Sequence, residues 1–184
     1  GAAAPREAEM LSRVWSADVR GIEGLPIEVQ VFVGGTFPMF VVAGLPDAAV
    51  KESKARIRSS IQEAGYRLPS NARVTVSLAP TEVRKNAAAH DLPIALGILI
   101  AGGVIDGGRA DRYAAVGELG LNGTIRPVRG ALSMAEAARE KGLRGILVPI
   151  ENACEAATAG IEVIPVGTLR EAAAFMAGQA IEPL

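Results

Sequence analysis

The sequence predicts an α+β fold, a mixed α/β sandwich with helices on one or both faces of a sheet. The first third of the chain alternates apolar and other residues with period two, as half-buried strands do. Later in the chain, strand and helix patterns alternate, which is typical of layered α/β domains. No Pro-, Gly- or Ser-rich linker divides the 184 residues. We therefore predict one domain over residues 11–178, with residues 1–10 as a tag remnant or disordered leader and 179–184 as a tail.

Strands open the predicted domain. The clearest one covers residues 27–33, where Ile and Val occupy every second position. Residues 13–21 form its expected partner and residues 39–43 a third strand. The pair Pro46-Asp47 then opens a helix that runs to Ala64 and ends at Gly65, the usual place for a C-terminal glycine.

The middle of the chain contains the helix that should be most buried. A strand over residues 73–78 leads into a loop over 79–90, and Asp91 is a suitable N-cap for a helix over residues 92–101. That helix is apolar on all sides, so it belongs in the core. Gly97 within it costs about 1 kcal/mol relative to alanine, which tight packing against a neighbour would explain.

The last third begins with a predicted hairpin. Residues 113–120 and 124–128 are its strands, joined at Asn122-Gly123, the strongest short-range turn signal, and we expect it to project from the sheet. The remaining predicted elements are a helix from Gly130 to Gly142, two strand–helix units at 145–149 with 151–158, and 161–166 with 169–177.

Composition excludes several classes of protein. One cysteine, Cys154, allows no intrachain disulfide, which fits a reducing, cytoplasmic location. One histidine and one cysteine leave almost no ligands for a transition metal. The longest apolar run is about 13 residues, against roughly 20 for a membrane span, so no membrane partner is expected. The sequence has no Gly-Lys-Ser/Thr phosphate loop, so no cofactor is expected within this chain.

Two groups of polar residues are candidates for a function. His90 beside Asp91 could suggest a catalytic pair, but sequence neighbours point apart, so we expect a loop histidine that is solvated or packs locally. Residues 47–90 hold eight basic and four acidic residues although the whole chain has a net charge of −1. A local basic excess of this kind indicates an anionic partner.

The basic excess gathers on one flank of the first helix. At 100° per residue Lys51, Lys54 and Arg58 fall together on this flank, while Glu52 and Arg56 fall on the other as an i,i+4 pair. Arg84 and Lys85 follow in the loop before the central helix. Such charges attract DNA phosphates without reading sequence. The alternatives are an ordinary solvated helix face and a set of ion pairs between subunits.

Three stretches carry a resemblance to a known family. They are Val42-Ala43-Gly44-Leu45-Pro46-Asp47-Ala48-Ala49-Val50-Lys51-Glu52-Ser53, His90-Asp91-Leu92-Pro93-Ile94-Ala95-Leu96, and Gly117-Glu118-Leu119-Gly120-Leu121-Asn122-Gly123-Thr124-Ile125-Arg126-Pro127-Val128-Arg129-Gly130. In this order they resemble the N-terminal domain of the ComM/YifB family of magnesium-chelatase-related AAA+ ATPases. The resemblance covers residues 11–178.

The resemblance implies a fold similar to the Lon protease domain and to the second domain of a small-subunit ribosomal protein. It also implies that a separate AAA+ module of the parent protein binds ATP and Mg²⁺. Expected partners are that module, further copies of the same protein (a hexamer at full length) and DNA. Family members are implicated in natural transformation, as helicases that drive branch migration of recombination intermediates.

Active Lon domains pair a serine with a lysine, which takes the serine proton. The resemblance places Ala89 at the serine position and Leu132 at the lysine position. Ser133 is next to the latter but cannot replace the pair. The loop before the central helix also departs from the family, since Lys85-Asn86-Ala87-Ala88-Ala89 stands where relatives have a Lys-Glu-Gly-Gly type of run. Within this loop, only Arg84 and Lys85 therefore remain as candidates for DNA contact.

Three functions remain open at this point. The first is a non-catalytic accessory and oligomerisation domain of a DNA-handling ATPase. The second is a domain of a magnesium-chelatase-type subunit that inserts Mg²⁺ into a porphyrin. The third is a degenerate Lon-like protease that keeps a substrate-binding surface but has no turnover. A phosphate-loop motif encoded immediately downstream would favour the first two.

Overall fold

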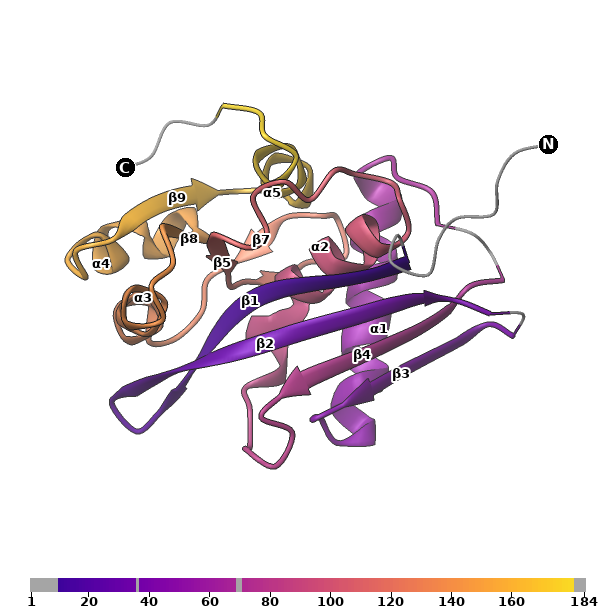
Figure 1. The fold of residues 1–184 in the computed structure, drawn as a ribbon, viewed down its shortest axis with the longest axis horizontal. Helices are drawn as coiled ribbons and strands as arrows, with labels where there is room; N and C mark the ends of the chain where they lie inside the picture. The colour runs from indigo at the N-terminus through magenta and orange to yellow at the C-terminus, as the bar shows by residue number, and fades with distance from the viewer. Residues whose placement is uncertain (1–9, 36, 69–70, 181–184) are drawn as a thin grey trace.

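The computed structural model describes residues 10–35, 37–68 and 71–180. The predicted leader therefore lies outside the described residues except for Met10, and the predicted tail is described only as far as Ala180. Within the described part the chain forms a mixed main sheet with helices on both faces, together with a small two-stranded sheet (Figure 1). This confirms the α+β class.

Seven strands make the main sheet, in the order β3-β4-β2-β1-β5-β8-β9. The pairs β5–β8, β8–β9 and β3–β4 are parallel. The pairs β1–β2 and β2–β4 are antiparallel. The strands are β1 (Leu11–Arg20), β2 (Glu23–Gly34), β3 (Met39–Ala43), β4 (Arg73–Ala79), β5 (Tyr113–Ala115), β8 (Gly145–Pro149) and β9 (Glu162–Val166).

The helices divide between the two faces of this sheet. Neighbouring strand residues show the division, because Leu147 belongs to one hydrophobic cluster while Ile146 and Val148 belong to the other. The first cluster includes residues of α1 (Asp47–Glu63), α2 (Asp91–Ala101) and α5 (Leu169–Met176). The second cluster includes residues of α3 (Ala131–Glu140) and α4 (Ala153–Ala157). Two short 3-10 turns, η2 (Ala87–His90) and η3 (Ile150–Asn152), precede α2 and α4.

Helix α2 is the buried helix that the sequence predicts. Every residue of it except Ile100 is buried. Gly97 is explained by close packing, because a Cβ at this position would lie 2.6 Å from Cγ2 of Val31 on β2. The glycine therefore brings the helix and the sheet together, and the prediction of a tight neighbour is confirmed.

The predicted hairpin is only partly correct. Its turn at Asn122-Gly123 is present, and Gly123 has a positive φ of 83°. The first predicted strand divides, however, into β5 in the main sheet and β6 (Glu118–Leu119), which pairs with β7 (Ile125–Arg126) in a separate two-stranded sheet. The physical reason is that the peptide groups between β5 and β6 bond elsewhere, since Gly117 N donates to Ala89 O and Gly117 O accepts from Leu92 N.

The hairpin also does not project. Ser59 Oγ and Ser60 Oγ on α1 donate to the carbonyl oxygens of Leu121 and Gly120, at 2.6 and 2.7 Å. These two bonds hold the turn against α1. The turn was expected to project from the sheet, but it packs against α1, because Ser59 and Ser60 satisfy two of its carbonyl groups.

Candidate functional site

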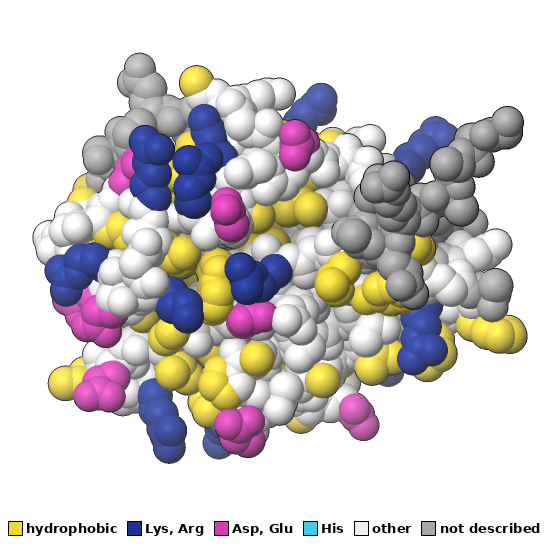
Figure 2. Space-filling view, in the orientation of Figure 1, with side chains coloured by type: hydrophobic (Ala, Val, Ile, Leu, Met, Phe, Trp, Pro, Cys, Tyr) yellow, Lys and Arg dark blue, Asp and Glu magenta, His cyan; other side chains and the backbone are white. Residues whose placement is uncertain are grey.

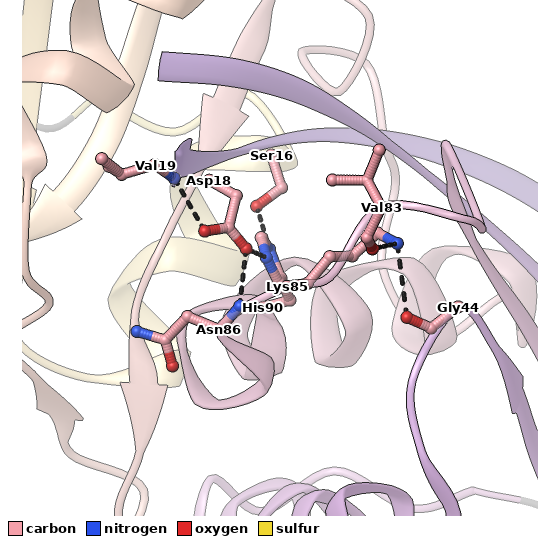
Figure 3. A network of polar contacts seen from close by, with 8 residues as sticks. All are labelled: Ser16, Asp18, Val19, Gly44, Val83, Lys85, Asn86 and His90. Carbon is pink, nitrogen blue, oxygen red and sulfur yellow. Dashed lines mark hydrogen bonds and ion pairs between the residues drawn. The ribbon is translucent and has the colours of Figure 1, made fainter. Parts of the chain in front are cut away.

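The polar centre of the molecule lies where the C-terminal half of β1 meets the start of α2 (Figure 3). Ser16 and Asp18 stand two residues apart on β1, so their side chains leave the same face of the strand. His90, the last residue of η2, reaches both of them. Its Nε2 lies 2.7 Å from Asp18 Oδ2, and its Nδ1 lies 2.8 Å from Ser16 Oγ. A carboxylate only accepts, so Nε2 donates to Asp18, while the direction of the bond between Nδ1 and the Ser16 hydroxyl depends on whether Nδ1 carries a hydrogen.

This placement corrects the sequence prediction for His90. The side chain is neither solvated nor packed locally, because it is 0% exposed and bonds to a strand more than 70 residues away. No sequence signal marked this partner. The pairing depends on which strand the sheet places under the start of α2.

Asp18 uses both of its oxygens within the protein. Oδ1 accepts from Val19 N at 2.7 Å, and Oδ2 accepts from Asn86 N at 2.8 Å as well as from His90. Burial raises the pKa of the Asp18 carboxyl, but the bonds and charge from His90 and the two backbone donors outweigh it, so the net shift is downward. Asp18 therefore stays ionised and holds the loop before α2 against β1.

The hydrogen-bonded order Ser–His–Asp is that of a hydrolase triad, but the serine and the histidine are closed off from a substrate. Ser16 is 2% exposed and Asp18 is 5% exposed. Among the described residues no buried side-chain nitrogen or oxygen lacks a hydrogen-bond partner, so the buried polar atoms of this network are all engaged within the protein. The arrangement acts as a structural clamp in this conformation.

A second buried ion pair lies beside the first network. Asp91 is 0% exposed, and its Oδ2 and Oδ1 accept from Nε and Nη2 of Arg56 at 2.6 and 3.2 Å, while Oδ2 also accepts from Leu119 N at 3.2 Å. Two predictions are thereby corrected. Asp91 makes no side-chain cap to α2, and the ion-pair partner of Arg56 is Asp91, not Glu52. The reason is that a buried carboxylate without a cation destabilises the fold more than a helix end without a side-chain cap.

The two positions matched to the Lon pair carry hydrocarbon side chains in their structural context. Ala89 is buried in the cluster formed by α3, and Leu132 packs against the same cluster from the first turn of α3. Neither side chain can transfer a proton. Ser133 is engaged elsewhere, since its Oγ donates to Ile22 O at 2.9 Å.

The structure separates the predicted basic residues into different surroundings. Lys51 and Arg58 are exposed on α1 and Lys54 is half-buried between them. Arg84 is exposed, but Nζ of Lys85 donates to Val83 O at 2.8 Å and Gly44 O at 3.3 Å. Burial lowers the pKa of Lys85, against the nearby charges of Asp18 and Glu82. Lys85 thus ties two loops together, and only its remaining N–H is left for a ligand.

A polar cleft of about 970 Å³ lies between the β1–β2 turn and the loop before α2. Its cations are Arg20, Arg84 and Lys85, and Asp18 lies at its wall. Arg20 is a residue that sequence reasoning missed, since nothing in its position before Gly21 links it to residue 84. On the face seen in Figure 2, basic and acidic side chains are interspersed. Because Arg20 and Arg84 line the same cleft, Arg20 joins Arg84 as a candidate for contact with an anionic partner.

Two other features are absent from the described part of the chain. Within residues 10–35, 37–68 and 71–180, no group of three His, Cys, Asp or Glu side chains is placed to hold a metal ion. In that same part of the chain no helix is both long and apolar enough to cross a bilayer.

Comparison with known proteins gives the class of this α+β domain. The chain belongs to the family described as subunit ChlI of Mg-chelatase, whose family model matches residues 27–152. Within that class it is similar to YifB of Escherichia coli, with 38% identity over 132 residues, or 72% of this chain and 26% of the relative. It is also 35% identical over 130 residues to the competence protein ComM of Haemophilus influenzae, covering 71% of this chain and 25% of ComM.

An uncharacterised protein of Mycobacterium bovis matches more of the chain, with 34% identity over 169 residues, or 91% of this chain and 33% of the relative. These names support the ComM/YifB magnesium-chelatase-related family that the three motifs indicate. The chain spans a quarter to a third of the length of these relatives.

Proposed function

We propose that this chain is a non-catalytic accessory domain of a ComM-like, magnesium-chelatase-related AAA+ ATPase, where it supports assembly and contacts DNA. The observation that carries the non-catalytic part is the closed Ser16–His90–Asp18 network. Its three side chains are buried and bonded to each other, while Ala89 and Leu132 supply no replacement chemistry. ATP and Mg²⁺ belong to a separate AAA+ module of the parent protein under this proposal.

The DNA-contacting part of the proposal rests on exposed cations. Lys51 and Arg84 are exposed, and Arg20 in the cleft is exposed as well. None of the three forms an ion pair within the described part of the chain. Cations without an internal partner keep their charge available for phosphate oxygens. Lys54 extends this group along α1.

The affinity of one domain should be low. About three to five phosphate contacts give a slope near −3 to −4 in log affinity against log salt. Binding by a single copy should then be micromolar or weaker at physiological salt. Several linked copies would multiply this modest affinity without any new contact. Fluorescence anisotropy with a labelled duplex, repeated at several salt concentrations, measures both quantities.

The test compares variants that carry the same charge change. Lys51→Glu and Arg84→Glu should each weaken DNA binding and reduce the salt slope by about one. Arg170→Glu is the matched control, because Arg170 is exposed on a different helix, α5, and it should leave the slope unchanged. Equal losses in all three variants, or no wild-type binding even at low salt, would reject DNA contact by this domain.

The non-catalytic part has its own test. Peptide and ATP turnover by the isolated chain should both stay at the level of a buffer blank. Turnover that disappears in His90→Ala or Ser133→Ala, while the folded fraction is unchanged, would show that the domain is an enzyme.

A second candidate follows from the family description, which refers to Mg-chelatase. If the parent protein inserts Mg²⁺ into a porphyrin, loss of the gene should stop pigment synthesis. If it handles DNA in a ComM-like way, loss of the gene should reduce transformation and leave pigment unchanged. The two gene-deletion phenotypes distinguish the candidates.

A further inference from the structure

An apolar cavity of about 310 Å³ opens between α1 and the outer strands of the sheet. Phe40 of β3, Ile61 of α1 and Ile98 of α2 are among the side chains that line it. Arg58 is exposed and Met39 is 46% exposed, and both also line the cavity, so they lie at its opening. The result is an apolar socket with a cation at its mouth.

The socket lies at one end of the main sheet, beside a strand with an unprotected edge. In the described part of the chain β3 pairs with β4 alone, and residues 39–43 contain neither proline nor a charged side chain. Proteins usually protect an exposed edge with one of these. The strand at the opposite end, β9, contains both Glu162 and Pro165. The β3 end therefore has the features of a contact surface.

A surface of complementary chemistry lies at the opposite end of the sheet. Ile150, the first residue of η3 after β8, is 56% exposed. Its side chain and that of Glu171 border Gly167, where a Cβ would lie 2.9 Å from Ile150 Cδ1 and 3.4 Å from Glu171 Oε1. Glu151 and Glu171 are exposed, and neither forms an ion pair with a described residue. Ile150 is therefore an exposed apolar knob, with Glu151 next to it in the chain and Glu171 beside the same glycine.

We propose that the socket of one copy of this chain receives Ile150 of a second copy, with Glu151 and Glu171 facing Arg58. The inference deepens the assembly role proposed above and rests on it. An isoleucine side chain is small enough for the cavity, and burying it removes an exposed apolar group from water. The socket lies at the β3 end of the sheet, whereas Ile150 follows β8, the strand beside β9 at the other end (Figure 1). The contact is therefore heterologous and leads to a ring or an open chain, not to a symmetric dimer.

Disulfide trapping tests the geometry directly. In a Cys154→Ser background that keeps Ile150, Glu151→Cys combined with Met39→Cys should give a ladder of dimers, trimers and higher species on oxidation. The matched control combines Glu151→Cys with Ile22→Cys, since Ile22 is 90% exposed on the β1–β2 turn. The trapping uses about 1 mM protein, where a contact with a millimolar dissociation constant is substantially populated. A ladder no stronger than the control overturns the proposal.

Charge exchange separates this proposal from DNA contact. Arg58→Glu should reduce trapping severalfold, and adding Glu171→Lys to the same chain should recover it. Lys51→Glu makes the same charge change on the same helix, but it lies about 10 Å further along the axis and outside the cavity, so it should not affect trapping. Failure of Glu171→Lys to recover trapping overturns the pairing. The anisotropy result with Lys51→Glu and Arg84→Glu is unaffected by either outcome.

Discussion

Replacing Arg56 by methionine removes the cation beside a carboxylate that has no contact with solvent. Asp91 is 0% exposed and Nε of Arg56 lies 2.6 Å from its Oδ2, with a second bond of 3.2 Å from Nη2 to Oδ1. Breaking such a buried pair from one side costs about 3–5 kcal/mol. Because the Arg56 side chain is still 19% exposed, solvent screens part of the attraction. We expect a loss of about 3 kcal/mol at pH 8.

The loss should depend on pH in a known direction. Burial raises the pKa of Asp91 above 3.8, and Arg56 opposes that rise. Without Arg56 the folded-state pKa moves further up, so the penalty for a buried anion is complete above that pKa. It decreases as the pH falls through the raised value, because the protonated carboxyl is neutral. The free-energy deficit of Arg56→Met relative to wild type should therefore shrink between pH 8 and pH 5.

Urea unfolding of both proteins at the two pH values measures this deficit. Lys51→Met is the matched control on the same helix, because Lys51 is exposed, and it should change stability by less than about 0.5 kcal/mol. A deficit for Arg56→Met below about 1 kcal/mol, or one that is equal at pH 8 and pH 5, would refute the assignment of Arg56 as the partner of a buried, ionised Asp91.

Three further changes test the core and the polar centre. Ile98→Ala should cost roughly 2–5 kcal/mol in urea unfolding, because Ile98 is 1% exposed in the core. Gly97→Ala should cost about 1–3 kcal/mol despite its better helix propensity, because the new methyl would lie 2.6 Å from Val31 Cγ2. Asp18→Asn should be less stable at pH 7 but should lose less stability on acidification. The pKa of Asp18 beside His90 is lowered in the folded protein. The resulting stability is present above pH 3.8, the ordinary pKa of the carboxyl, and is lost as the pH falls through the folded-state pKa. Circular dichroism during an acid titration would follow this loss.

Each of these has a control on the surface. Ile22→Ala removes a side chain that is 90% exposed, and Gly108→Ala adds a methyl whose nearest contact is Asp106 Oδ1 at 3.9 Å. Asp106→Asn removes an exposed carboxylate in place of a buried one. If a control changes stability as much as its partner, the tight packing or the buried bond is not the cause.

Local pattern determined most of the secondary structure of this protein. The alternation at 27–33, the apolar run at 92–101 and the Asn122-Gly123 turn each identify an element without reference to the rest of the chain, because periodicity and turn conformation are properties of neighbouring residues. The three family motifs likewise lie in the sequence itself, and the matches to YifB and ComM bear them out. The basic flank of α1 could also be read from helix geometry alone.

Only the tertiary structure decided which polar groups meet. Ser16, Asp18 and His90 come together because the sheet places β1 under the start of α2, and residues 74 positions apart carry no mutual signal in one sequence. Asp91 pairs with Arg56 and does not cap α2, and this too is a result of the tertiary structure. An unpaired carboxylate in the interior would cost more free energy than a missing helix cap, because solvent or backbone groups can replace a cap. The socket at β3 and the knob at Ile150 also depend on strand order, because only the sheet puts them at opposite ends of one molecule.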